Sequence, residues 1–267
     1  MMKDRFQRTV DYLRVSVTDR CNLRCHYCYP CDSPLEPQSN RKLTLTEIVS
    51  VVSTALEMGV TRVRLTGGEP LVRKDIVQLV GRLAALCGLV DLALTTNGQL
   101  LRRLAGPLAA AGLQRINVHL DTVDPERYTK LTGGGNLGET LLGLEAARVS
   151  GITPVKINCV VAFGSDEPDA REVAKYAQNN GYGVRFIRRM NLKSGVFSIV
   201  DGGNGGDCPR CNRLRLSSVG MVRPCLFSDL AFDVRQLGAR AAIERAVALK
   251  PKAGTVCQTQ SFYAIGG

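Results

Sequence analysis

Hydrophobic and polar positions along the chain follow two periods, one typical of strands and one of helices. Short apolar runs, typical of buried strands, lie at residues 12–17, 62–65, 90–95, 115–120, 154–161 and 184–189. Between them, helical spacing predicts helices near 74–86, 99–110, 137–149 and 167–179. A further helix should open at Thr44-Leu45-Thr46-Glu47, where either threonine can cap it. Four helix ends are followed by glycines suited to left-handed backbone, namely Gly59, Gly112, Gly151 and Gly181.

Strands that alternate with helices predict a parallel sheet. We therefore expect an α/β fold, a partial (βα)6 barrel of the TIM type, whose strand ends gather functional loops on one rim. The loop bearing Cys21, Gly67-Gly68-Glu69 and Thr96-Asn97-Gly98 each follow a strand end. Residues 1–190 are expected to form the barrel. Residues 191–267 should form a C-terminal region with a glycine-rich connector, 193–207, and an appendage that begins near Cys208.

Composition narrows the class of protein. The chain of 267 residues is 45% hydrophobic and 22% charged, an ordinary globular balance. It contains no apolar run of the roughly 20 residues that span a bilayer and no apolar signal core near Met1. We expect a cytoplasmic protein without a membrane partner. The net charge of +11 comes without a run of five Lys or Arg, which favours a small phosphorylated ligand over nucleic acid.

The first group of cysteines points to metal. Ten cysteines in an intracellular chain favour metal over disulfides. Cys21, Cys25 and Cys28 form a C-x3-C-x2-C loop after the first strand. Three thiolates are one short of a structural zinc site, but they leave one iron of a [4Fe–4S] cube open to a substrate amine and carboxylate. Zinc completed by His26 or Cys31, or a disulfide pair, is the alternative. We do not expect Cys31 to be a ligand of the cluster, because a fourth thiolate would close the open iron.

This loop resembles the signature of the radical S-adenosylmethionine (SAM) superfamily, whose enzymes reduce the bound sulfonium and release a 5′-deoxyadenosyl radical. The resemblance implies a [4Fe–4S] cluster on the three cysteines and SAM as cosubstrate. Tyr27 occupies the aromatic position that lies against the adenine. Gly67-Gly68-Glu69-Pro70 is similar to the glycine-rich motif whose backbone meets the methionine amine.

The second group is Cys208, Cys211 and Cys225, spaced C-x2-C-x13-C. A zinc ribbon would need a fourth ligand, which Cys257 could supply. A second open cluster fits better, because Arg213 and Arg215 alternate on one face of an extended segment. Two guanidiniums beside an open iron suit a phosphorylated ligand.

Together the two groups resemble a narrower family, the GTP 3′,8-cyclases of molybdenum cofactor biosynthesis. The match runs from Leu13 to the double-glycine tail, Gly266-Gly267. It includes the following segments: Leu65-Thr66-Gly67-Gly68-Glu69-Pro70-Leu71, Thr95-Thr96-Asn97-Gly98, Leu120-Asp121-Thr122, Lys156-Ile157-Asn158-Cys159-Val160-Val161, Arg185-Phe186-Ile187 and Cys211-Asn212-Arg213-Leu214-Arg215-Leu216.

The resemblance implies two sets of binding residues. GTP would be held by Arg14, Arg64, Thr95, Lys156, Arg185, Arg213 and Arg215. SAM would be surrounded by Tyr27, Gly68, His119 and Met190. Independently of the resemblance, four of these cationic residues, Arg14, Arg64, Lys156 and Arg185, fall in predicted strands. A charge buried there costs several kcal/mol unless it is paired. A triphosphate is one such partner, and a solvated strand end or an internal salt bridge is the alternative.

The implied reaction starts when the radical takes hydrogen from ribose C3′. The carbon radical adds to guanine C8, and reduction yields (8S)-3′,8-cyclo-7,8-dihydroguanosine 5′-triphosphate. The resemblance also implies an electron donor such as flavodoxin or ferredoxin and is compatible with a homodimer. The alternatives are a related radical enzyme acting on another nucleotide or a peptide, and a non-catalytic iron–sulfur or zinc protein.

Two departures from the family pattern stand out. The family has several dozen more residues before the second cysteine group, and Arg188-Arg189-Met190-Asn191 replaces an acidic and proline-containing sequence. The short connection could therefore lack part of one wall of the substrate site. His119 stands where a serine is common.

Overall fold

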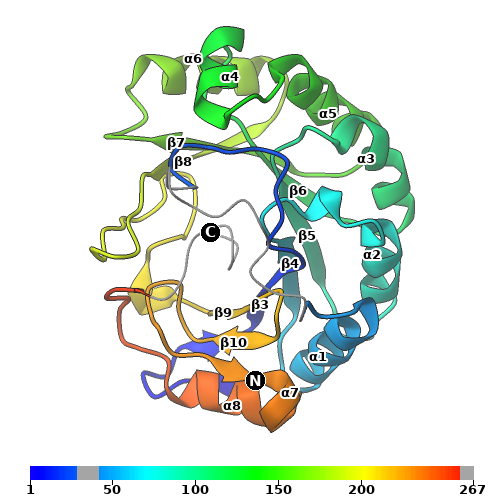
Figure 1. Cartoon of the computed structure of the whole chain (residues 1–267), viewed down its shortest axis with the longest axis vertical. Helices are drawn as coiled ribbons and strands as arrows, with labels where there is room; N and C mark the ends of the chain where they lie inside the picture. Colours follow the sequence, from blue (N-terminus) through cyan, green and yellow to red (C-terminus); the bar gives the residue numbers. More distant parts are fainter. Residues whose placement is uncertain (29–41, 259–267) are drawn as a thin grey trace.

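The computed structural model describes residues 1–28 and 42–258, and its main feature is a curled sheet of nine strands (Figure 1). Cys31, Gly266 and Gly267 lie outside the described residues. The sheet has the order β11-β10-β9-β3-β4-β5-β6-β7-β8. Its strands are β3 (Tyr12–Ser16), β4 (Arg62–Thr66), β5 (Asp91–Thr96), β6 (Arg115–His119), β7 (Val155–Val161), β8 (Gly183–Arg188), β9 (Arg213–Leu216), β10 (Met221–Arg223) and β11 (Phe232–Asp233). A separate two-stranded sheet pairs β1 (Met2–Lys3) with β2 (Thr9–Val10).

The helices line the outer side of the curled sheet, as Figure 1 shows. They are α1 (Leu45–Glu57), α2 (Ile76–Ala84), α3 (Leu101–Ala110), α4 (Pro125–Thr132), α5 (Leu137–Val149), α6 (Pro168–Asn179), α7 (Val234–Leu237) and α8 (Ala239–Ala248), with short 3-10 turns η1 (Pro70–Val72) and η2 (Cys208–Arg210). Among the described residues, no helix is both long enough and apolar enough to cross a membrane.

The predicted α/β partial barrel is confirmed. The six predicted strands are β3 to β8, and each pairs in parallel with the next. Thr44 caps α1 in a reciprocal capping box with Glu47, as the sequence indicated. The four glycines after helix ends all have positive φ, between 72° and 104°, where a residue without Cβ is unstrained.

Helix α4 was not predicted. Its residues are mostly polar and leave little apolar periodicity to detect. A local signal was present, because Asp124 accepts a hydrogen bond from the Arg127 N–H and Pro125 occupies the first turn.

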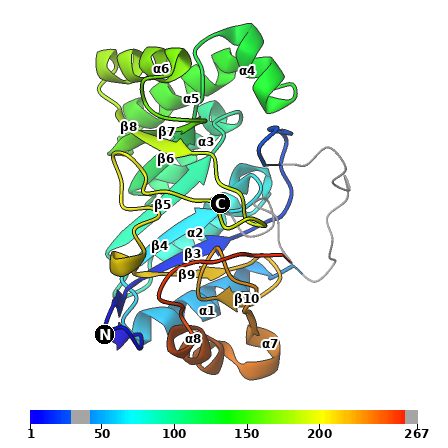
Figure 2. The same cartoon turned by 90° about the vertical axis from the view of Figure 1, so that its left-hand side faces the viewer.

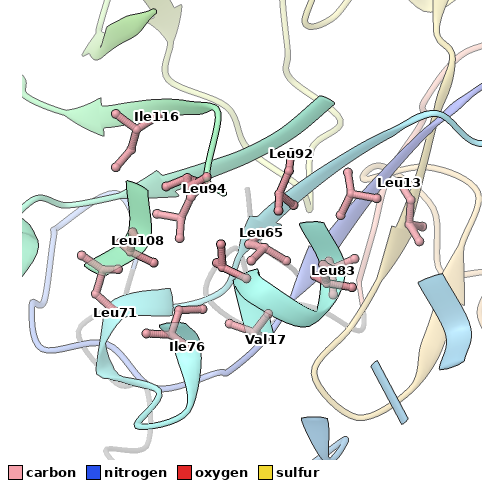
Figure 3. Close-up of a cluster of buried hydrophobic side chains, with 14 of the residues drawn as sticks. Leu13, Val17, Leu65, Leu71, Ile76, Leu83, Leu92, Leu94, Leu108 and Ile116 are labelled. Carbon is pink, nitrogen blue, oxygen red and sulfur yellow. The ribbon is translucent and has the colours of Figure 1, made fainter. Parts of the chain in front are cut away.

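The main core lies between the sheet and its helices (Figure 3). Leu13, Leu65 and Leu94 come from strands and Ile76 and Leu83 from α2, and all five belong to one buried cluster. Side chains of a strand alternate between its two faces. The residues next to Leu13 and Leu65 in β3 and β4 therefore point to the inside of the curl. Arg14 and Arg64 occupy such positions. The pattern that builds the core therefore also directs cations inward.

The C-terminal region continues the barrel sheet. Strand β9 pairs in parallel with β3, and β10 and β11 follow antiparallel. In the side view, β9 and β10 lie next to β3, with α7 and α8 beneath them (Figure 2). Helix α8 packs against α1. The second cysteine group is thereby brought beside the strands that carry Arg14 and Arg64.

Candidate active site

Two adjoining cavities open inside the curl. One is lined by Cys21, Cys25 and Cys28, and the other by Cys208, Cys211 and Cys225. Both cavities include Thr95, Asn158, Ile187 and Met190 in their walls. These four residues therefore form a wall that the two cavities share.

Hydrogen-bond donors surround one sulfur of the first cysteine loop. The Leu23 N–H donates to Cys21 Sγ at 3.4 Å, and Asn97 Nδ2 lies 3.8 Å from the same sulfur. Burial raises the pKa of Cys21 to about 11 and those of Cys25 and Cys28 to about 12. These thiols are neutral without metal and must release protons to bind it. Donors to sulfur and three converging thiols fit an iron–sulfur cluster.

The glycine motif packs directly on this loop. A Cβ on Gly68 would lie 2.3 Å from the carbonyl oxygen of Arg20, so a side chain there would collide with backbone. The Gly68 N–H donates to the carbonyl of Thr18 at 2.8 Å. Any contact of Gly68 with a ligand amine would therefore use its carbonyl oxygen.

Glu69 holds the end of this motif in place. It is buried and accepts hydrogen bonds from the N–H groups of Leu71 and Asn97 and from Thr96 Oγ1. Burial outweighs these donors and raises the pKa of Glu69 to about 7. Glu69 thus ties the loop after β4 to the end of β5, which is a structural role.

Tyr27 and His119, which line the first cavity, form a hydrogen-bonded network with Asp121. The Tyr27 hydroxyl donates to Asp121 Oδ2 at 2.8 Å, and His119 Nε2 lies 2.9 Å from the same oxygen. Tyr27 also lies within hydrogen-bond distance of His119. Burial disfavours the imidazolium, but the charge of Asp121 outweighs it and raises the pKa of His119. Asp121 was not among the predicted site residues, although it belongs to the Leu120-Asp121-Thr122 motif.

Arginines from three neighbouring strands meet in the second cavity. Arg64 of β4 pairs in register with Arg14 of β3, which pairs with Arg215 of β9. Arg213 is two residues before Arg215, on the same face. Arg64 Nε donates to the Tyr12 hydroxyl at 2.5 Å, and its Nη1 donates to Thr95 Oγ1 at 3.3 Å.

Arg62 and Arg115 of the second cavity pair with Asp11 and Asp91, but three other arginines of its lining have no carboxylate partner in the described residues. Within residues 1–28 and 42–258, none of Arg64, Arg185 and Arg213 forms an ion pair. Arg185 Nε and Ser198 Oγ line this cavity, are buried and have no hydrogen-bond partner in that part of the chain. The described residues therefore do not support the alternative that internal salt bridges compensate the charge of these three arginines. The cavity fits an anion with several acceptor oxygens.

The short connector forms a wall of the second cavity. Asp201 pairs back on the barrel through a bridge to Phe186 of β8, and a second bridge, between Asn191 and Val196, closes a local turn at the start of the connector. Asn204 Oδ1 accepts from Arg213 Nη2 at 2.5 Å. A Cβ on Gly206 would lie only 2.0 Å from the carbonyl oxygen of Ser198. Glycine is required for this close packing, which explains the composition of the connector.

Cys257 does not line the second cavity, although Cys225 packs against the small apolar cluster to which Cys257 belongs. Cys257 is buried in this cluster with Leu192, Leu226 and Phe227, and its thiol donates to Asp229 Oδ1 at 3.3 Å. Among the described residues, no group of three or more Cys, His, Asp and Glu side chains could hold a single metal ion.

Of the residues predicted to bind the substrate, Lys156 alone does not line the second cavity in the described part of the chain. Burial and then the charge of Arg185 lower its pKa, so its ammonium still lies in the field of the cavity arginines. Conversely, Tyr12, Asn117 and Asn158 line the cavity but were not predicted. Two-residue alternation from Arg14 and from Lys156 was the signal that could have indicated Tyr12 and Asn158.

Known proteins resemble this chain along nearly its whole length. The sequence profile of the radical SAM superfamily matches residues 15–177. GTP 3′,8-cyclases from Moorella thermoacetica and Thermodesulfovibrio yellowstonii are 38% and 35% identical to it, each over 305 aligned positions that cover 94% of this chain and 94% and 95% of the relatives. The alignments are longer than the 267 residues of this chain, so these relatives contain residues without a counterpart here.

Solved structures share the fold. A native anSMEcpe with bound AdoMet and the Kp18Cys peptide has a TM-score of 0.62 at 14% identity, covering 90% of this chain and 81% of that one. SuiB of Streptococcus suis bound to its precursor peptide SuiA has a TM-score of 0.60 at 20% identity, covering 76% of this chain and 45% of that one.

Proposed function

Because the chain belongs to the radical SAM superfamily and, within it, to the family of the GTP 3′,8-cyclases, we propose that it converts GTP to (8S)-3′,8-cyclo-7,8-dihydroguanosine 5′-triphosphate in molybdenum cofactor biosynthesis. The observation that carries this proposal is the pair of cysteine-lined cavities with shared walls, of which the second is lined with arginine. A radical made in one cavity would be next to a nucleotide held in the other.

The first cavity would bind SAM. Cys21, Cys25 and Cys28 would hold a [4Fe–4S] cluster, whose chemistry is the reductive cleavage of SAM to a 5′-deoxyadenosyl radical. Tyr27 would lie against the adenine, with its ring orientation set by Asp121 and His119. Gly68 and Met190 would complete the wall.

The second cavity would bind GTP. Cys208, Cys211 and Cys225 would hold the second cluster near the purine. Arg14, Arg64, Arg185, Arg213 and Arg215 would bind the triphosphate, with Thr95 beside them and Lys156 acting through its charge. The proposal is supported by the buried Arg185 Nε and Ser198 Oγ, which have no partner in the described chain. A triphosphate would offer acceptors to both.

The proposal includes an external electron donor, such as flavodoxin or ferredoxin, and a cytoplasmic location. A homodimer and the functional division of the chain into residues 1–190 and 191–267 also belong to it.

Nucleotide binding and turnover test this proposal together. Reconstituted protein is titrated calorimetrically with GTP, ATP and UTP, and then incubated anaerobically with SAM, dithionite and GTP. We expect GTP to bind most tightly and to give a cyclised product by mass analysis. Tight binding of a different nucleotide, or of a peptide, with no heat from GTP would reassign the substrate and leave the clusters in place.

A further inference from the structure

Lys250 lies behind the second cysteine group and outside the cavity lining. It follows α8, and its side chain is buried, with 1% of the residue exposed. Its Nζ donates to the carbonyl oxygens of Arg213, at 2.6 Å, and Pro224, at 2.7 Å. These carbonyls lie two residues after Cys211 and one residue before Cys225. One ammonium group therefore ties together the two chain segments that present these cysteines.

The ammonium group also lies beside the sulfurs of the second cysteine group. A lysine ammonium has three donors, and two of them reach the carbonyls of Arg213 and Pro224. Its charge acts on the thiols of both Cys211 and Cys225. Lys250 is therefore placed to act on any group that these two cysteines bind.

The charge of Lys250 has no carboxylate partner in residues 1–28 and 42–258. A buried, uncompensated ammonium is costly. Three thiolates on an iron–sulfur cluster would supply the missing negative charge. The reduction potential of such a cluster depends on nearby charge and on hydrogen bonds to its sulfurs.

We propose that Lys250 is a positioning residue for the second cluster: its ammonium holds the Cys211 and Cys225 segments together, and its positive charge raises the reduction potential of the cluster bound there. A cation beside the cluster stabilises the reduced, more negative state. The inference does not depend on the identity of the nucleotide.

The test uses the full chain with Cys21, Cys25 and Cys28 changed to Ala, so that only the second cluster forms. Lys250→Gln removes the charge but keeps two amide donors for the carbonyls. Lys252→Gln removes the same charge from an exposed side chain two residues away and is the matched control. Iron content and the midpoint potential, from a titration followed by electron paramagnetic resonance, are measured for each.

We expect K250Q to retain iron and to titrate at a more negative potential, with K252Q unchanged. A K250Q variant with full iron and an unchanged potential would overturn the proposal, as would an equal shift in K252Q. If K250Q does not hold iron, Lys250→Arg decides: a cluster retained in K250R supports a cation that holds the segments, and equal loss in both variants contradicts it.

Discussion

Arg14 of β3 and Arg215 of β9 are register partners in neighbouring parallel strands. Burial, and then the charge of Arg215, hold the pKa of Arg14 well below its usual value, and burial lowers the pKa of Arg215 to about 10. Two neighbouring guanidiniums repel each other, and an anion bound between them would relieve this repulsion. The pairing of β9 with β3 therefore builds an anion site from residues far apart in the chain.

Removal of one arginine from the second cavity should slow the conversion of GTP more than the cleavage of SAM. Loss of a charge-assisted contact costs roughly 1.5–3 kcal/mol. Arg215→Ala or Arg213→Ala should therefore lower the rate of GTP product formation by about 10- to 150-fold, with a much smaller effect on SAM cleavage. Arg148→Ala, on the exposed face of α5, is the control. Equal losses in both steps would argue against a nucleotide site at these arginines.

The first cysteine group should be essential for radical initiation. Cys28→Ala should abolish the formation of 5′-deoxyadenosine from SAM, because two thiolates cannot hold a stable cluster with one open iron. Chromatography of anaerobic reactions measures this product. Cys87→Ala, an exposed thiol outside both groups, should match the unchanged protein. Product at the unchanged rate from the Cys28 variant would refute the ligand assignment.

Metal content should separate the second cluster from zinc. Reconstituted protein should bind about eight iron atoms per chain, and the triple change of Cys208, Cys211 and Cys225 to Ala should halve this. SAM cleavage should survive better than GTP product formation, since the two cavities have separate duties. Cys257→Ala should leave the iron content unchanged. Stoichiometric zinc beside about four irons would favour the zinc ribbon.

His119 should influence both SAM binding and the pH dependence of stability. His119→Ala removes a neighbour of Tyr27, and loss of one hydrogen bond at about 0.5–1.5 kcal/mol corresponds to about 2- to 12-fold weaker SAM binding by calorimetry. The pKa of His119 is raised in the folded chain, so its contribution to stability is full below the unfolded pKa and is lost as pH rises through the folded pKa.

Denaturant titrations of the same variant check the sign of this effect. The stability difference between the unchanged chain and H119A should be larger around pH 6 than around pH 8. A difference that grows with pH would show that Asp121 does not stabilise the imidazolium.

The barrel could be predicted from the sequence because its strands and helices have local patterns. Strands β3 to β7 are largely buried or alternate clearly, and α1, α3, α5 and α6 are each followed closely by a glycine of positive φ. Strands β9 to β11 are short, and their place beside β3 depends on pairing rather than on local propensity. The alternation of Arg213 and Arg215 was visible, but their strand partner was not.

The candidate site divides in the same way. Cysteine spacing and the Gly67-Gly68 motif are local, so they could be recognised. The role of Lys250 could not, because its partners at Arg213 and Pro224 are set by the sheet and by the packing of α8. The wall formed by the connector could not be predicted either. It exists because a glycine-rich segment returns onto β8, and the sequence of this segment has no hydrophobic period that would indicate such a return.

Isotope transfer tests the central claim most directly. GTP carrying deuterium at ribose C3′ is incubated anaerobically with reconstituted protein, SAM and dithionite, and the 5′-deoxyadenosine formed is examined by mass spectrometry. We predict that it carries one deuterium from this substrate and none from GTP labelled at C2′, alongside a cyclised product. Unlabelled 5′-deoxyadenosine from the C3′-labelled substrate, with GTP recovered unchanged, would contradict the assignment as a GTP 3′,8-cyclase.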